Sequence, residues 1–345
     1  MPSDSSSPRE AFASAHPAAS ATRPIAITMG DPCGIGPEIV LKACADASLG
    51  GLALRVVGDA RWLAREAARL SLPMPSDVDD VVTLPDALPV GRIDPRAGDA
   101  AHRCIVHAAG LALRDEVRAI VTAPIAKEAM HAAGHRFPGH TELLAELAGG
   151  ADVRMMLANP ELRTVLVSIH VPLREAIERL DRAGVLRTIT IADASMRRSG
   201  LARPRIAVAG LNPHAGEGGL FGREEIEIIA PAVAEARDAG IEVSGPFAPD
   251  TVFMRARGFR EFDLVVAMYH DQGLIPVKYL GIDDGVNVTL GLPFVRTSPD
   301  HGTAFDRAGR PGPDGRGLAD PGSLIAAIRE AARLSRAASH ESTDA

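Results

Sequence analysis

Short runs of β-branched apolar residues alternate with longer stretches rich in Ala, Leu, Arg and Glu along most of the chain. The short runs have the length and composition of buried strands, and the longer stretches have those of amphipathic helices. Regular alternation of the two is typical of parallel α/β architecture. The pattern predicts strands at Ile25–Met29, Leu54–Val57, Ala119–Thr122, Thr164–Ile169, Ile206–Leu211 and Leu264–Tyr269. It predicts helices at Glu38–Ala45, Arg61–Leu70, Ala126–Ala133, Glu142–Leu147, Leu173–Leu180, Arg223–Ala239 and Gly322–Leu334.

Length and composition narrow the class of protein. The 345 residues suit about two domains. A net charge of −7 and an aromatic content of 3% argue against nucleic acid or a membrane surface as partner. No apolar run approaches the ~18 residues of a membrane span. The three irregularly spaced cysteines suggest reduced thiols, and we expect a cytoplasmic protein.

The two ends of the chain differ in composition from the rest. Residues 1–23 are rich in Ser, Ala and Pro and lack the apolar core of a secretory signal, so we expect a disordered leader. Residues 336–345 are expected to form a frayed tail.

Polar, chemically capable residues follow several of the predicted strands directly. His170 ends one strand, His214 lies in the Gly-rich loop after the next, and His270 ends another. Ligands of open α/β sheets bind beyond the carboxyl ends of the strands. The three neutral imidazoles could therefore share a divalent metal with open positions for substrate. The alternative is three separate loop histidines with local hydrogen bonds, and spacing alone leaves both interpretations open.

The loop Met29–Glu38 joins the first strand to the first helix and holds three glycines, which allow close approach of a ligand to the backbone. It matches neither the Rossmann nor the P-loop pattern, and a tight turn without ligand is the alternative.

Anion-binding groups are predicted in two further places. Thr141 suits the N-cap of a helix whose free N–H groups could bind an anion, although ordinary capping is the alternative. We expect the nearby Lys127 to be solvated. Lys278, Asn287 and Arg296 fall in a stretch that reads as loop-rich, where they could hold a phosphate or carboxylate.

Six segments together resemble the 4-hydroxythreonine-4-phosphate dehydrogenase family of pyridoxal phosphate biosynthesis, which also includes phospho-threonate and phospho-erythronate dehydrogenases. The resemblance runs from about Ile25 to about Ala331. The segments are Thr28–Glu38, Val121–Lys127, Pro138–Glu142, Leu211–Gly218, Tyr269–Gly273 and Asp300–Ala304.

The resemblance implies a fold similar to isopropylmalate and isocitrate dehydrogenases, with two α/β/α domains and a cleft between them. The first domain would comprise residues 24–140 and 290–335, and the second residues 141–289. A homodimer whose partner completes each site is also implied.

The resemblance assigns roles to the candidate residues. It implies one divalent metal ion (Zn, Mg or Co) on the three histidines, and NAD or NADP against a cofactor loop. The substrate-binding positions are His140, Thr141, Lys278, Asn287 and Arg296, and the cofactor positions are Asp300, His301, Gly302 and Thr303. Asp250 and Asp271 are candidates for catalytic proton transfer or for support of the metal ligands.

Two departures from the family pattern stand out. Cys33 replaces a usual Ala, and Pro311–Arg316 is an apparent insertion that we expect to form a mobile surface loop near the adenosine end of NAD.

The implied reaction oxidises the secondary hydroxyl of 4-phosphohydroxy-threonine with NAD. The resulting β-keto acid would lose carbon dioxide to give 3-amino-2-oxopropyl phosphate. The first alternative is a dehydrogenase of 4-phospho-threonate or 4-phospho-erythronate, and the second is a non-catalytic ligand-binding protein on the same scaffold.

Overall fold

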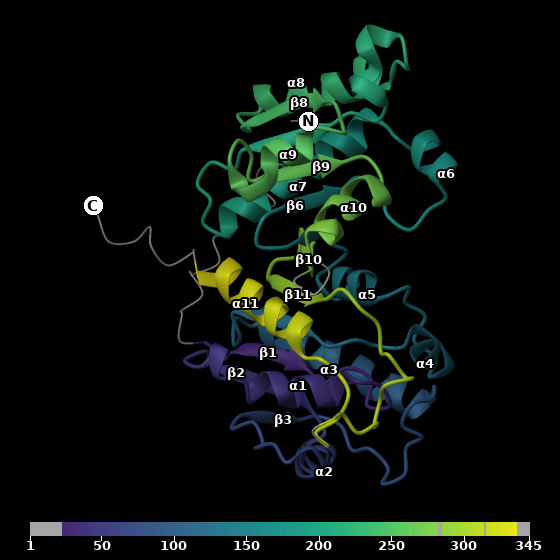
Figure 1. Cartoon of the computed structure of the whole chain (residues 1–345), viewed down its shortest axis with the longest axis vertical. Coiled ribbons are helices and arrows are strands. Elements are labelled where there is room, and N and C mark those ends of the chain that lie inside the picture. Colours follow the sequence, from purple (N-terminus) through teal and green to yellow (C-terminus); the bar gives the residue numbers. More distant parts are fainter. Residues whose placement is uncertain (1–22, 282–284, 314, 337–345) are drawn as a thin grey trace, which may run out of the picture.

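A computed structural model describes residues 23–281, 285–313 and 315–336 of the chain. Apart from Arg23 and Arg336, the predicted leader and tail lie outside the described residues. The described strands form one eleven-stranded sheet in the order β3-β2-β1-β4-β11-β10-β5-β6-β9-β7-β8. Helices lie on both sides of this sheet (Figure 1). The α/β class predicted from the sequence is confirmed.

The first half of the sheet is parallel and occupies the lower part of Figure 1. Its elements are β1 (Ile25–Thr28), α1 (Gly36–Cys44), β2 (Leu54–Gly58), α2 (Ala60–Leu70), β3 (Val78–Asp80), α3 (Pro95–Leu113), β4 (Ala119–Thr122), α4 (Lys127–Ala132), α5 (His140–Leu147) and α11 (Gly322–Arg336).

The second half is also parallel from β6 onward and occupies the upper part of the view. Its elements are β6 (Arg163–Leu166), α6 (Leu173–Glu178), α7 (Arg182–Arg198), β7 (Ile206–Ala209), η3 (Pro213–Gly219), η4 (Glu225–Ile229), α8 (Ala230–Asp238), β8 (Val243–Phe247), α9 (Val252–Ala256), β9 (Leu264–Ala267) and α10 (His270–Leu280).

Three central strands join the halves. β10 (Val286–Leu290) is antiparallel to both β11 (Val295–Pro299) and β5 (Arg154–Ala158), and β11 is parallel to β4. Since β10 and β11 follow the whole second half in sequence, the chain returns to the first half through the middle of the sheet. A buried hydrophobic cluster lines both halves, and a smaller one packs around α9 and α10.

The six predicted strands and seven predicted helices all correspond to observed elements, but the loop-rich prediction after His270 is wrong. Lys278 lies in α10, Asn287 in β10 and Arg296 in β11. α10 forms despite Pro276 in its interior, and it packs closely on the sheet. A Cβ at Gly273 would lie 2.5 Å from Leu166 Cδ2, so only glycine permits this contact.

The predicted helix Arg223–Ala239 is two elements. A π-helical turn, η4, precedes α8, and Pro231 stands in the first turn of α8. Proline supplies no N–H to the preceding helical turn, and a wider π turn accommodates the missing bond.

Candidate functional site

Arg296 forms the most deeply buried part of the candidate site. It is 3% exposed, and its guanidinium donates to Thr122 Oγ1 at 2.6 Å and to Thr289 Oγ1 at 3.0 Å. Its Nε has no hydrogen-bond partner among the described residues. Burial lowers the pKa of Arg296 to about 10, although the nearby Glu142 opposes this shift. A buried, charged guanidinium held only by neutral hydroxyls is the arrangement expected where an anionic ligand supplies the missing charge.

The start of α5 lies beside Arg296. The helix begins at His140 with Gly139 as N-cap, so the prediction of Thr141 as N-cap is wrong. No side chain caps these N–H groups, which leaves them available to an anion. His140 Nε2 is buried without a partner among the described residues. Burial, Arg296 and Lys127 all lower the pKa of His140, so this imidazole is neutral.

Two of the three predicted metal histidines meet. β6 pairs with β9, so the residues following these strands are neighbours, and the His170 and His270 ring centroids are 5.5 Å apart. Burial, His270 and Lys127 lower the pKa of His170. Two adjacent imidazoles, one held neutral by its surroundings, fit a divalent ion.

His214 does not complete a triad within one chain. Among the described residues, no three His, Cys, Asp or Glu side chains form a group with metal-binding spacing. His214 follows β7, on the other side of β9, and its ring lies 6.3 Å from that of Phe221. Its loop turns sharply, with positive φ at His214, Ala215 and Glu217. Such backbone is costly and persists where the surroundings fix it.

A buried carboxylate that sequence reasoning missed fixes this loop. Glu225 is 2% exposed, and its Oε1 accepts from the backbone N–H groups of Leu211 and Asn212, both at 2.7 Å. The only sequence signal was an acidic residue inside an otherwise amphipathic helix.

The predicted acidic residues have different surroundings. Asp271 Oδ1 lies 2.7 Å from His270 Nδ1, which suits a carboxylate that orients a metal-ligating imidazole. Asp250 is exposed between β8 and α9.

Predicted substrate and cofactor residues meet at one ion pair. Lys278 Nζ, from α10, lies 2.6 Å from Asp300 Oδ2, just after β11. Asn287 is half-buried in β10.

The predicted cofactor loop packs against the Gly-rich opening loop. Ile35 N–H donates to Thr303 O at 3.0 Å, and a Cβ at Gly34 would lie 2.9 Å from Thr303. Glycine is therefore required here, and the buried opening loop supports the loop that carries Thr303. His301 and Gly302 are exposed on it.

Asp31, in the same opening loop, was also missed. It is fully buried, and its Oδ1 accepts from Cys33 N–H at 2.8 Å. Burial raises the pKa of Asp31 to about 6, with a further contribution from Asp94. Cys33 itself is buried, so the unusual residue packs inside the loop.

The residues on either side of the insertion are joined by a backbone hydrogen bond. Leu318 N–H donates to Arg310 O at 3.1 Å, so the chain leaves and returns at one point. The described residues of Pro311–Arg316 are exposed or half-buried, as a surface loop requires.

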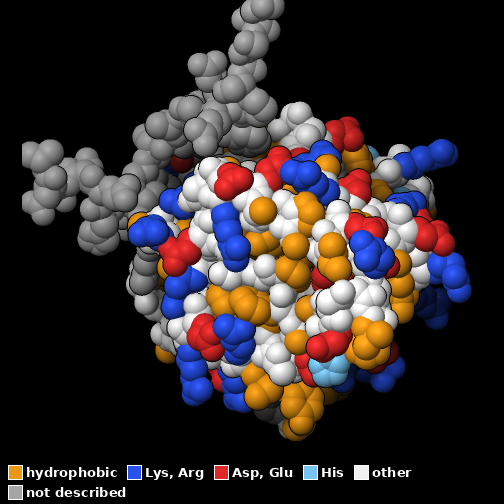
Figure 2. Space-filling view, turned by 90° about the horizontal axis from the view of Figure 1, so that it is seen from above, with side chains coloured by type: hydrophobic (Ala, Val, Ile, Leu, Met, Phe, Trp, Pro, Cys, Tyr) orange, Lys and Arg blue, Asp and Glu red, His pale blue; other side chains and the backbone are white. Residues whose placement is uncertain are grey.

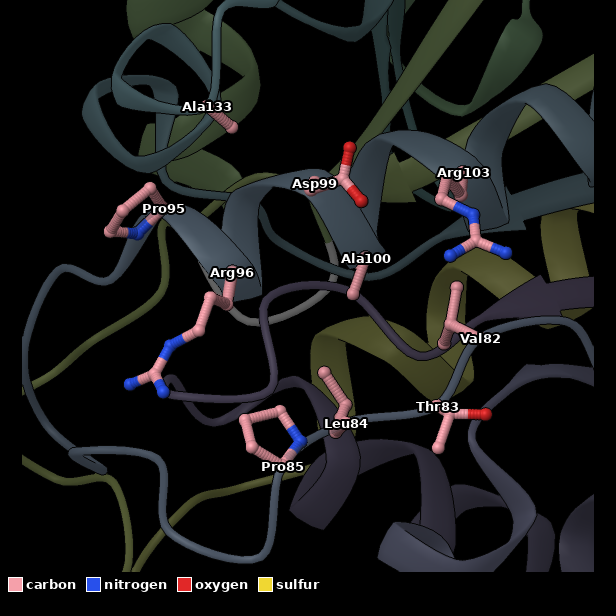
Figure 3. Close-up of a pocket in the computed structure, with 10 residues that line it drawn as sticks. All are labelled: Val82, Thr83, Leu84, Pro85, Pro95, Arg96, Asp99, Ala100, Arg103 and Ala133. Carbon is pink, nitrogen blue, oxygen red and sulfur yellow. The ribbon is translucent and has the colours of Figure 1, made fainter.

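A hollow of about 630 Å³ lies elsewhere in the first half (Figure 3). It is bounded by residues 82–85 and by the first turns of α3, with Arg96, Asp99 and Arg103 among its polar residues. None of the predicted site residues lines it.

Buried Arg296, the uncapped start of α5 and the adjacent histidines define an α/β enzyme that handles small anionic molecules. Residues 31–331 match the family of "Pyridoxal phosphate biosynthetic protein PdxA". The chain is 51% identical over 337 residues to a 4-hydroxythreonine-4-phosphate dehydrogenase from Beijerinckia indica, covering 90% of this chain and 95% of the relative. It is 50% identical over 305 residues to a D-threonate 4-phosphate dehydrogenase from Salmonella typhimurium, covering 83% and 93%.

Solved structures agree with these relatives. A 4-hydroxythreonine-4-phosphate dehydrogenase from Klebsiella pneumoniae matches with a TM-score of 0.84 and 46% identity, covering 91% of this chain and all of that one. The chain therefore belongs to the PdxA family and is a dehydrogenase, which confirms both the resemblance and the enzyme prediction. No helix in the described ranges has the length and apolar character needed to cross a membrane.

Proposed function

We propose that this chain is a metal-dependent NAD dehydrogenase that oxidises the secondary hydroxyl of 4-phosphohydroxy-threonine. Arg296 carries the proposal, because its buried charge has no acidic partner among the described residues and stands beside the uncapped start of α5. A phosphate dianion at this point would satisfy both the guanidinium and the helix N–H groups.

The phosphate anchor and the histidines have separate tasks. Arg296, His140 and Thr141 would hold the phosphate and so orient the carbon to be oxidised. His170 and His270 would hold the metal, with Asp271 keeping the His270 ring in place. When bound, the metal would lower the pKa of the substrate hydroxyl and NAD would accept the hydride. The loops carrying Gly34 and Thr303 would receive the cofactor.

A second substrate, 4-phospho-D-threonate, has nearly equal support. The relatives named for the two substrates are 51% and 50% identical to this chain. The substrates differ at carbon 2, which carries an ammonium in one and a hydroxyl in the other. A panel of 4-phosphohydroxy-threonine, 4-phospho-D-threonate and 4-phospho-erythronate, assayed by NADH absorbance with metal supplied, identifies the substrate. Absence of turnover with all three would overturn the proposed function.

We also propose that a second copy of the chain supplies the third histidine. Exposed large apolar side chains flank the histidine-bearing segments of the second half, namely Leu173, Ile177, Leu220, Phe221, Ile226, Ile275 and Tyr279. Figure 2 views the β8 end of the molecule and shows apolar groups interspersed among charged ones there. A two-fold interface formed by these segments would bring His214 of one copy toward His170 and His270 of the other.

Mixed dimers test this arrangement. His214→Ala and His270→Ala place both defects in the same site of a heterodimer, so mixing leaves the other site of each heterodimer intact and restores about a quarter of all sites. His170→Ala mixed with His270→Ala is the matched control, because neither site of that heterodimer is intact. Equal recovery in both mixtures, or none in either, contradicts the shared site. A cytoplasmic homodimer remains part of the proposal.

A further inference from the structure

Lysine is almost absent from this chain. The sequence holds 34 arginines but only three lysines: Lys42, Lys127 and Lys278. An ammonium differs from a guanidinium in being a compact point charge with three rotatable donors. The three lysine positions are therefore the ones at which a compact cation could have a specific task.

Two of the three lysines have a structural explanation. Lys42 Nζ donates to Glu38 Oε1 at 2.9 Å and to the carbonyl oxygens of Gly317 and Ala319 at 3.0 and 2.6 Å. These acceptors converge on one atom, which a planar guanidinium could not match. Lys278 pairs with Asp300 at 2.6 Å. In the described part of the chain, Lys127 has no ion-pair partner.

Lys127 also stands where a cation does not favour the fold. It is the first residue of α4, and a positive charge at a helix N-terminus opposes the helix dipole. The residue is exposed and caps nothing. Neither packing nor helix stability accounts for it, so the expectation of an ordinary solvated lysine leaves its position unexplained.

The side chain of Lys127 reaches the candidate site. A Cβ built on Gly139 would lie 3.6 Å from Lys127 Cε and 3.4 Å from Glu142 Oε2, so the lysine extends across the start of α5. Its charge acts on two groups at once: on His140, beside the phosphate anchor, and on His170, of the histidine pair. Lys127 is thus within electrostatic range of both ends of the proposed substrate site.

We propose that Lys127 is a further catalytic residue, whose ammonium donates a hydrogen bond to the substrate oxygen that becomes the carbonyl. This inference rests on the proposed function, because it places the reacting carbon between the phosphate anchor and the histidine pair. The ammonium keeps its three protons throughout and adds no bond-making step. The hydroxyl proton passes to water, and the ammonium stabilises the resulting alkoxide from which the hydride then passes to NAD.

The scarcity of lysine permits a direct test of the contact. Reductive ¹³C-methylation labels only three lysines and the terminal amine, so each lysine gives a resolvable NMR signal, assigned with Lys127→Arg. Saturating 4-phospho-D-threonate should shift the Lys127 signal and leave that of Lys42 unmoved, and inorganic phosphate should shift Lys127 less. An unmoved Lys127 signal, with binding verified by calorimetry, overturns the proposal.

Kinetics then separate a catalytic contact from a mere positive charge. Lys127→Arg keeps the charge but should lower kcat about 100-fold with KM within threefold, since one donor to a developing oxyanion is lost. Lys127→Met should lose at least as much. Arg136→Ala, which removes an exposed charge from the α4–α5 connection, is the matched control and should retain wild-type rates.

The outcomes distinguish this inference from the proposed function. Wild-type kcat in Lys127→Arg would show that any cation suffices and would overturn the catalytic role. A wild-type protein that binds 4-phospho-D-threonate with the Lys127 shift, yet turns over no substrate, would overturn the proposed function and leave the contact standing.

Discussion

Replacing Arg296 by methionine should weaken substrate binding sharply without unfolding the protein. The guanidinium is 3% exposed, and burial lowers its pKa from 12.5 to about 10. That shift means that the charged form of Arg296 is about 3 kcal/mol less stable in the folded protein than in the unfolded chain. The cost is present at every pH below about 10, because the folded pKa is the lower one.

Methionine removes this cost and keeps most of the side-chain volume. It also removes the hydrogen bonds to Thr122 and Thr289, worth about 1 kcal/mol each. The two effects nearly cancel, so the free energy of unfolding should change by less than about 2 kcal/mol. The ligand phosphate, in contrast, loses charge-assisted hydrogen bonds worth together about 3 kcal/mol, which is more than a 100-fold increase in Kd.

Calorimetric titration with the phosphorylated substrate gives Kd, and thermal or urea unfolding gives stability. Arg163→Met is the matched control. Arg163 is also buried with its pKa lowered to about 10, but it stacks on Phe259 at 4.1 Å and should leave Kd unchanged. Unchanged substrate affinity in Arg296→Met, or a loss of stability above about 4 kcal/mol, would refute the anion site and make Arg296 a structural residue.

Three further predictions address other parts of the chain. Alanine at His170, His214 or His270 should each abolish metal binding and turnover with the fold intact; stoichiometric metal by mass spectrometry in any variant removes that residue from the ligand set. Asp31→Asn should raise the melting temperature near pH 8 but not near pH 4. The pKa of Asp31 in the folded protein is about 6, above the ordinary 3.8, so its ionisation destabilises the fold by about 3 kcal/mol near pH 8 but not near pH 4. An equal change in melting temperature at both pH values would contradict this reasoning. Deleting Pro311–Arg316 should leave the melting temperature unchanged and confine any kinetic change to KM for NAD; a fall above about 5 °C would mean that the loop packs into the fold.

The sequence predicted β6, β7 and β9, the strands that precede the three histidines, because their apolar runs are uninterrupted. It did not predict β3, β5, β8, α3 or α7, which carry no candidate site residue, and it did not predict β10 and β11, where polar residues of the candidate site replace apolar ones. β10 and β11 contain Asn287, Thr289 and Arg296, so they lack the continuous hydrophobic signal of central strands. α10 contains Pro276, which disfavours a helix in sequence-based prediction, and Gly273, which close packing on β6 and β9 requires. Local propensity was thus misleading where the functional residues lie.

The buried groups around the site illustrate a second limit. Glu225 and Asp31 look like ordinary acidic residues in the sequence. No pattern in the sequence shows that the N–H groups of Leu211 and Asn212, 14 and 13 positions before Glu225, donate to its carboxylate. Nor does any pattern show that the N–H group of Cys33, two positions after Asp31, donates to the carboxylate of Asp31. Lys127 was read as solvated for the same reason. Its exposure agrees with that expectation, but its approach to Gly139 depends on α4 and the start of α5 both packing against α3.

The three predicted metal histidines set the last limit, because the proposed site would group them across two copies of the chain. His170, His214 and His270 occupy equivalent positions after parallel strands, and no sequence signal separates them. In the fold, the order β6-β9-β7 places β9, the strand before His270, in the middle. His170 and His270 come together, whereas the Glu225-anchored loop holds His214 apart. A loop that is rigid, strained and exposed beside Leu220 and Phe221 is suited to present its histidine to another molecule rather than to its own chain. Catalytic competence would then require association, and the enzyme would lose its metal on dilution below the dimer dissociation constant.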